Sequence, residues 1–173
     1  MKREVVIGIG LIVILIGLII ITPVSANDQT DLAKVRQATA NFRRVEIAKA
    51  AGYDLREGLD HCFENPGVGA MGFHYIRQPL DLKLDPLQPE AMVYAPGPEG
   101  QLKLGAVEYI VPAADWDAAG NTKPPMLLGH HLHMNKDLGV YILHIWLWRH
   151  NPAGMFEDWN PTVSCPKQGI YDN

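Results

Sequence analysis

The chain begins with an uninterrupted apolar run of 17 residues, from Val5 to Ile21, and this run decides which part of the sequence can fold as a domain. Lys2 and Arg3 precede it, and Val24-Ser25-Ala26 follows it with small residues where a signal peptidase cleaves. This order is typical of an export signal that ends at residue 26. Because the run also reaches the lower limit of a membrane span, roughly 17–25 residues, the alternative is a retained N-terminal anchor.

Residues 27–173 suit a single extracytoplasmic domain. Removal of residues 1–26 from the 173-residue chain leaves 147 residues, enough for one domain with one core. They carry 13 basic and 18 acidic side chains, a formal net charge of −5. We exclude nucleic acid as a partner, because neutralisation of phosphates supplies most of that affinity and the domain has no basic run. We expect membrane contact only through residues 1–26, and the sequence does not predict an oligomeric state.

The chain contains two cysteines, Cys62 and Cys165. In an exported protein an even pair usually forms a disulfide. The pair fits no zinc-ribbon spacing and contains no C-x-x-C motif, so we predict a bridge rather than metal or redox thiols. The bridge would close a loop of about a hundred residues, which is worth on the order of 4–5 kcal/mol.

One helix is predicted, from Asp28 to Ala51. Its apolar residues recur at three- and four-residue spacing, and Gly52 follows as a natural C-terminal stop. The recurring residues are Leu32, Val35, Ala38, Phe42 and Val45. We expect this amphipathic helix to pack on a sheet.

The rest of the chain has strand composition, with β-branched and aromatic residues between turn residues. Strands are predicted at Gly72–Arg77, Gln101–Val111 and Gly139–His150, and a loop is predicted at Asp115–Pro125. A helix followed by a strand-rich remainder predicts an α+β fold. We expect the N-terminal amphipathic helix to pack on an antiparallel sheet that curves toward a small barrel.

Strand alternation selects candidate site residues. Glu108 shares the more apolar face of its strand with Leu104, Ala106 and Ile110, and His144 lies in the middle of a strand that is apolar on both faces. A carboxylate on an apolar face is costly unless it is paired or bound to a cation.

Two further histidines extend the set of candidate ligands. His74 lies in the Gly72–Arg77 strand, and the stretch GHHLHMN (129–135) adds three histidines, of which His133 is the candidate ligand. The sequence thus predicts a metal site formed by His74, Glu108, His133 and His144.

Each of these residues also has a structural explanation. His144 can be a core histidine with both nitrogens hydrogen-bonded, and Glu108 can pair with Arg77 or Arg149. The GHHLHMN stretch can be a solvated hairpin, in which His130 and His131 face solvent. The sequence leaves these alternatives open.

Four blocks of sequence resemble a family of exported bacterial proteins of uncharacterised function. The likeness runs from about residue 52 to residue 166, and the blocks are GAMGFHY (69–75), GAVEYIVP (105–112), LHIWLWRHNPAGMF (143–156) and DWNPTVSCP (158–166). The resemblance places His74, Glu108, His133 and His144 at polar positions of the family, and Cys62 and Cys165 at its cysteines. His130 and His131 have no counterpart there. The resemblance implies no activity, fold or cofactor.

We therefore expect an extracytoplasmic domain that binds a divalent transition metal, zinc or copper, since imidazole and carboxylate suit both. Whether it is an enzyme is open, because the chain contains no G-x-S-x-G, H-E-x-x-H or P-loop motif. The alternative is a protein that binds a small ligand without metal in a pocket lined by tryptophan. Haem belongs to that alternative, with His74, Tyr75 or His144 as the axial ligand.

Overall fold

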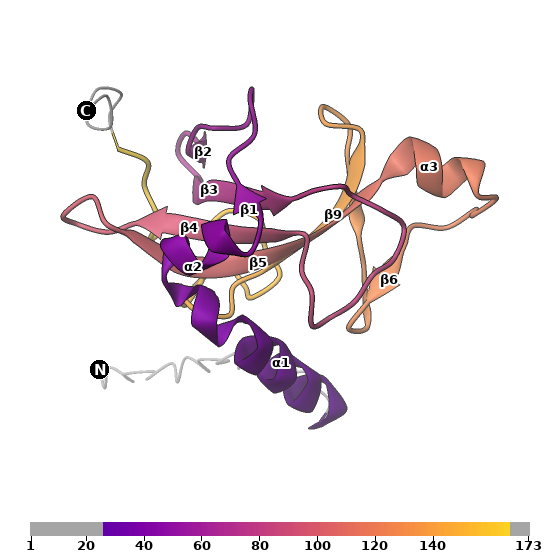
Figure 1. Cartoon of the computed structure of the whole chain (residues 1–173), viewed down its shortest axis with the longest axis horizontal. Helices are drawn as coiled ribbons and strands as arrows, with labels where there is room; N and C mark the ends of the chain where they lie inside the picture. The colour runs from indigo at the N-terminus through magenta and orange to yellow at the C-terminus, as the bar shows by residue number, and fades with distance from the viewer. Residues whose placement is uncertain (1–25, 167–173) are drawn as a thin grey trace, which may run out of the picture.

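The computed structural model describes residues 26–166, so the predicted signal peptide or anchor lies almost entirely outside the described residues. Within them, no helix is both long enough and apolar enough to cross a bilayer. The fold is α+β, with a short helical region followed by a mainly antiparallel sheet (Figure 1). The helical elements are α1 (Ala26–Thr39), the 3-10 turn η1 (Ala40–Arg43), α2 (Val45–Ala50) and α3 (Ala113–Ala118).

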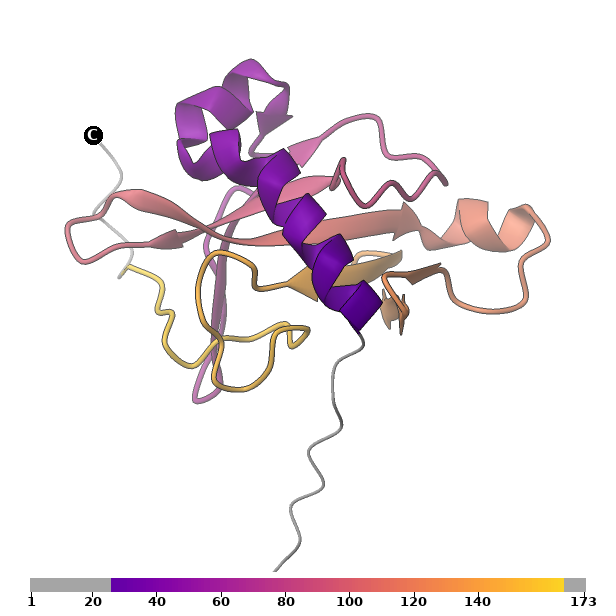
Figure 2. The same cartoon turned by 90° about the horizontal axis from the view of Figure 1, so that it is seen from below.

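The segment predicted as one helix, Asp28–Ala51, is helical but not continuous, so the prediction of a single helix was wrong. The helix is interrupted at Thr39, whose buried hydroxyl donates to the Val35 carbonyl at 2.9 Å, a local bond that competes with regular helix geometry. Arg44 is extended, with φ −101° and ψ 118°, and α2 starts in a new direction. The break lets α1 cross the sheet (Figure 2) while Ala48 of α2 reaches the same core as Val35.

The main sheet has seven strands, and every strand pair is antiparallel. Its order is β1-β3-β4-β5-β9-β8, with β2 paired to β3. The sheet is antiparallel as predicted, but its strands do not close into a barrel. The strands are β1 (Tyr53–Asp54), β2 (Phe63–Asn65), β3 (Gly69–Arg77), β4 (Ala91–Pro96), β5 (Leu102–Pro112), β8 (His133–Asn135) and β9 (Val140–Ile145). A separate hairpin pairs β6 (Met126–Leu127) with β7 (His130–His131).

The prediction of the Gln101–Val111 strand is confirmed by β5, whereas two other predictions need correction. The strand predicted at 139–150 ends at Ile145, where the Leu147 amide bonds back to the Ile145 carbonyl at 3.0 Å and the chain leaves the sheet. The loop predicted at 115–125 begins inside α3. Strand β4 was not predicted, because all residues from Ala91 to Ala95 are buried and the segment shows no alternation of polar and apolar residues.

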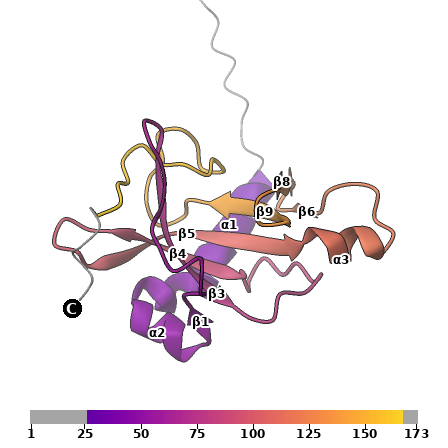
Figure 3. The same ribbon diagram turned by 90° about the horizontal axis from the view of Figure 1, so that it is seen from above.

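The sheet has two differently covered faces, defined by the strand register. The helix-covered face carries Tyr75, Tyr94, Val107, Tyr109 and Leu143, which pack in one core with Val35 and Ala48 of the helices. The opposite face carries His74, Ile76, Ala91, Val93, Ala106, Glu108, Ile110, Ile142 and His144. Figure 3 shows α2 on one side of β4 and β5, and β2 with the segment that follows β9 on the other. We call this second side the loop-covered face.

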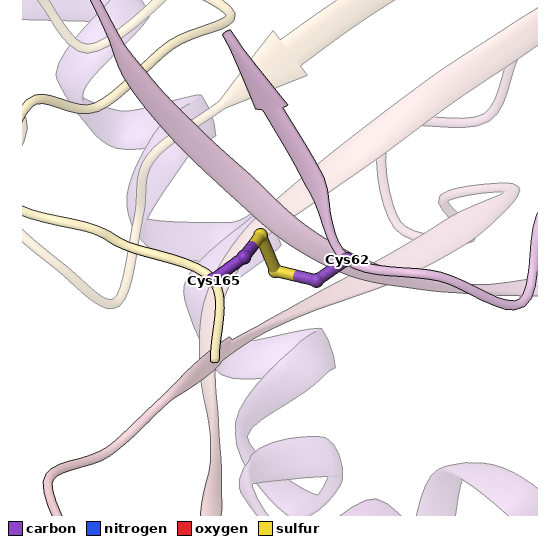
Figure 4. Close-up of a disulfide and its surroundings, with 2 residues drawn as sticks. All are labelled: Cys62 and Cys165. Atoms are coloured by element: carbon purple, nitrogen blue, oxygen red, sulfur yellow. A yellow bond between two sulfur atoms is a disulfide. The ribbon is translucent and has the colours of Figure 1, made fainter. Parts of the chain in front are cut away.

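The predicted disulfide joins Cys62 to Cys165, with the two Cα atoms 5.7 Å apart (Figure 4). It closes a sequence separation of 103 residues and ties the C-terminal segment to the start of β2. Both partners lie on the loop-covered side of the fold. A disulfide is typical of an oxidising, extracytoplasmic compartment, in agreement with the predicted location.

Candidate functional site

Sheet register brings His74, Glu108 and His144 together on the loop-covered face. Glu108 on β5 lies directly opposite His144 on β9. His74 on β3 lies opposite Val93 of β4. Ala91, two residues before Val93 and on the same face of β4, lies opposite Glu108. His74 therefore faces Glu108 diagonally across β4, within reach of long side chains.

The three side chains are close together and almost completely buried. His74 Nε2 is 3.6 Å from Glu108 Oε2, which is longer than a hydrogen bond. The ring centroids of His74 and His144 are 6.0 Å apart. His74 and Glu108 are each 5% exposed, and His144 is 0% exposed.

Burial keeps all three groups uncharged near neutral pH. Loss of solvation lowers the pKa of His74 to about 4, an effect that the Gly72 backbone and Asp158 only partly offset. The same cause, with a smaller contribution from His74, lowers the pKa of His144 well below its ordinary value. Burial, with a smaller contribution from Asp158, raises the pKa of Glu108 to about 8. The cluster is thus two neutral imidazoles beside a protonated carboxyl group.

Unpaired polar atoms concentrate in this cluster. Neither ring nitrogen of His144 has a hydrogen-bond partner within the described residues, and His74 Nδ1 has none either. A buried polar atom without a partner costs about 1–3 kcal/mol. The structural explanation of His144 as a hydrogen-bonded core histidine therefore does not hold for the protein alone.

His133 lies at the edge of the cluster and pairs with a residue that we did not predict. It is opposite Ile142 in the β8–β9 register, on the face that carries His144. Its Nε2 is 3.0 Å from Asp158 Oδ2, and this hydrogen bond raises the pKa of His133. Its side chain is half exposed. His133 is therefore a peripheral member of the site.

Asp158 reaches the cluster because its segment is attached to β3. Ala70 and Asn160 form an antiparallel bridge, with reciprocal amide bonds of 3.2 and 3.1 Å. Gly69, at φ +149°, permits this approach, because a Cβ there would overlap the Asn160 backbone. The DWNP sequence that holds Asp158 belongs to a block that resembles the family, but a lone aspartate in a loop carries no periodic signal that predicts its place in a site.

The other two histidines of GHHLHMN lie outside the cluster, as the sequence suggested. His131 is exposed opposite Met126 in the β6–β7 hairpin, and His130 stacks on Phe156 with ring centroids 3.7 Å apart. Across residues 26–166 no three His, Cys, Asp or Glu side chains already surround a common metal position. His74, Glu108, His133 and His144 are close together but do not form a finished coordination sphere.

An apolar cavity of about 320 Å³ opens beside the cluster, with His74 and Glu108 in its wall. Ile76, Ile110 and Ile142 line it from the sheet, and Leu59, Phe63 and Leu80 line it from β2 and the connecting loops. Cavities of this kind, apolar with a few polar groups, are the usual form of small-molecule sites.

No tryptophan of the described chain lies in the wall of this cavity, so it is not the tryptophan-lined pocket of the alternative prediction. Trp146 and Trp148 lie where β9 has ended, and they line a separate hollow with Arg36. Trp148 Nε1 donates to Thr39 on the helix side at 3.2 Å, whereas Trp146 packs 4.9 Å from the ring of His144. Tyr75 is likewise on the helix-covered face, away from His74.

Comparisons of the chain with protein-family models, with curated proteins and with solved structures find no match.

Proposed function

We propose that this chain is an extracytoplasmic metal-binding protein whose loop-covered face holds a divalent transition metal, zinc or copper, between His74, Glu108 and His144. One observation carries the proposal: His144 is completely buried and neither of its ring nitrogens has a hydrogen-bond partner in the described chain. A bound metal ion would take the lone pair of one of these nitrogens and so offset part of the cost of burying the ring.

The spacing of the two imidazoles supports this proposal. A metal roughly 2.0–2.1 Å from one nitrogen of each ring leaves the ring centres about 5–6 Å apart, and the observed separation is 6.0 Å. Glu108 lies opposite His144, and its Oε2 is 3.6 Å from His74 Nε2, so this carboxyl group is the nearest third ligand. Two imidazoles with one carboxylate suit zinc, copper, iron or manganese, and among these zinc and copper favour imidazole most.

His133 would join the site through its pairing with Asp158. Histidines that bind metals almost always use their second ring nitrogen to contact a carboxylate or carbonyl. His133 Nε2 already contacts Asp158 at 3.0 Å, which leaves Nδ1 for a metal. With three or four protein ligands, a remaining coordination position would serve water or a ligand from the cavity that His74 and Glu108 line.

Metal binding would compete with protons on Glu108 and on His133, whose pKa values are both raised. Because the pKa of Glu108 is raised to about 8, binding near pH 7 releases the proton of that carboxyl group. His74, whose pKa is lowered to about 4, releases none at that pH. The affinity should rise as the pH increases from 6 to 8 and level off above 8.

The test is metal content per chain. The protein would be produced by export with its own N-terminal segment, purified without a polyhistidine tag, and analysed by elemental mass spectrometry. We expect about one zinc or copper ion per chain in the wild type and in His131→Ala, an exposed control. His74→Gln and His144→Leu should be folded and metal-free. A wild type that stays empty after dialysis against both metals would refute the proposal.

The cavity favours a second candidate, a protein that binds a small apolar ligand without metal. In it, the protonated Glu108 would donate a hydrogen bond to the ligand and His74 would orient it. The cavity of 320 Å³ has room for about ten water molecules at roughly 30 Å³ each. Because a porphyrin is much larger, we do not propose haem as the ligand.

A further inference from the structure

The cavity beside the cluster contains one charged side chain that has no role in the metal site. Arg56, in the loop between β1 and β2, lines the cavity together with the polar residues Gln78 and Asn135. It is the only lysine or arginine in the cavity wall, and it forms no ion pair with any acidic side chain of residues 26–166.

Arg56 is held in place by one hydrogen bond, but not all of its N–H groups have a partner within residues 26–166. One of its terminal nitrogens, Nη2, donates to the Ile76 carbonyl at 2.8 Å, which fixes the guanidinium beside the β3 edge of the cavity. Its Nε is buried and has no hydrogen-bond partner among the described residues. A guanidinium at the wall of an apolar cavity matches a carboxylate, whose two oxygens accept parallel N–H bonds.

The remaining wall determines the rest of the ligand. Ile76, Ile110 and Ile142 form an apolar surface along the sheet, and Leu59, Phe63 and Leu80 face the same space. A single arginine balances one negative charge, so the site suits a monoanion better than a phosphate.

We propose that this cavity binds an apolar monocarboxylic acid of about ten non-hydrogen atoms, a size set by its room for about ten waters, with the carboxylate on Arg56. The apolar body lies over Ile76, Ile110 and Ile142. This inference goes beyond the metal site: it rests on the cavity and Arg56, and it holds whether or not a metal is present.

Isothermal titration calorimetry of the full chain with octanoate and with 1-octanol tests the proposal. The two probes have nearly the same apolar body and differ in charge. We expect one octanoate per chain, bound at least about tenfold more tightly than 1-octanol, since a charged hydrogen bond contributes about 1.5–3 kcal/mol. Arg56→Gln should lower octanoate affinity about tenfold and leave 1-octanol unchanged. The exposed control Arg44→Gln should change neither.

A second pair of variants keeps the test decisive if Arg56→Gln folds poorly. Leu138 lies in the cavity wall and is 46% exposed, so polar replacements there are tolerated. Leu138→Glu should weaken octanoate binding and Leu138→Lys should strengthen it, each about two- to fivefold, as expected for a charge near the surface. The affinity for 1-octanol, which is uncharged, should not change in opposite directions in the two variants.

The same titrations separate this proposal from the metal site. Octanoate should bind equally well to the wild type in a chelator and to His144→Leu. Binding under those conditions supports the carboxylate site even if metal analysis fails. The proposal would be overturned if octanoate did not bind at millimolar concentration. It would also be overturned if octanoate and 1-octanol bound equally well and Arg56→Gln changed neither affinity. Neither result would bear on the metal site.

Discussion

The two faces of the sheet satisfy their buried polar groups to different degrees. On the helix-covered face the hydroxyl groups of Tyr53, Tyr94 and Tyr109 donate to the carbonyls of Pro89, Phe42 and Pro86 at 2.8, 2.6 and 2.6 Å. On the loop-covered side lie all the buried side-chain atoms of residues 26–166 that have no partner: His74 Nδ1, both nitrogens of His144, Arg56 Nε and Asp158 Oδ1.

This difference separates a structural core from a binding site. Native proteins leave few buried polar atoms unpaired, because each costs free energy. A random defect would be distributed over both faces, whereas here the unpaired atoms surround one cavity and one His–Glu–His cluster. We infer that the helix-covered face is complete in the protein alone, and that the loop-covered face is completed by what it binds.

The largest expected effect comes from the disulfide, which holds the cover of the loop-covered face. Cys62 precedes Phe63, whose ring lies edge-on to His74 with centroids 5.0 Å apart. Cys62→Ser/Cys165→Ser should lower the free energy of unfolding by about 4–5 kcal/mol, the value for a loop of roughly a hundred residues. Urea denaturation measures this loss.

A control separates the bridge from other effects of the reductant. Reductant should destabilise the wild type but have no effect on the double serine variant. If the double variant were as stable as the wild type, the bridge would not hold this face together.

The next largest effect is the pH dependence of the free energy of unfolding that Glu108 on the loop-covered face should cause. The folded state raises the pKa of Glu108 from about 4.5 to about 8, so between these values it keeps a proton that the unfolded state releases. Stability of the metal-free protein should therefore fall as pH rises through this window. Glu108→Gln removes the loss and should gain up to about 1.4 kcal/mol per pH unit over the wild type.

Denaturation in chelator at pH 5, 6.5 and 8.5 measures that gain. Glu57→Gln, at an exposed glutamate, is the matched control and should run parallel to the wild type. A Glu108→Gln curve that also runs parallel to the wild type would show that Glu108 is ionised in the folded protein, and the cluster described above would be wrong.

A smaller effect tests the unpaired imidazole itself. His144→Leu replaces two unsatisfied nitrogens by an apolar group of similar size, so the metal-free protein should gain about 1–3 kcal/mol. The exposed control His131→Leu should change stability by less than about 0.5 kcal/mol. Thermal unfolding in chelator gives both values. Destabilisation by His144→Leu in chelator would mean that the ring has a partner within the protein.

The smallest effect belongs to the helix-covered face. Tyr94→Phe deletes the donor to the Phe42 carbonyl and should cost about 1 kcal/mol. Chelator should leave this cost unchanged, because Tyr94 lies on the face away from the cluster. The same denaturation series measures it, with Tyr141→Phe, at a half-buried position of β9, for comparison. A cost that depends on metal would break the separation between the two faces.

Local pattern was enough to predict part of this arrangement. Alternation within β5 places Glu108 among apolar residues, and the even pair of cysteines in an exported chain predicts the Cys62–Cys165 bridge. The placement of His144 in a strand was also correct, but its predicted mid-strand position was wrong, because β9 ends at Ile145. These predictions depend on residues that are neighbours along the chain or on chemistry that does not need geometry.

The remainder depends on tertiary contacts that no local pattern records. The break in the helix arises where Thr39 meets Trp148, more than a hundred residues away. The end of β9 at Ile145 lets Trp148 turn to the helix side, and attachment of Asn160 to β3 brings Asp158 to the cluster. The positions of Arg56 and Asp158 were missed for this reason.

X-ray absorption spectroscopy at the edge of the bound metal tests the central claim most directly. The account predicts two or three imidazole nitrogens at roughly 2.0–2.1 Å and at least one carboxylate oxygen in the wild type. The His144→Leu variant should be metal-free and should give no absorption edge for that metal. A first shell of oxygen alone, or a wild-type spectrum unchanged by His144→Leu, would show that the metal does not bind at the buried cluster.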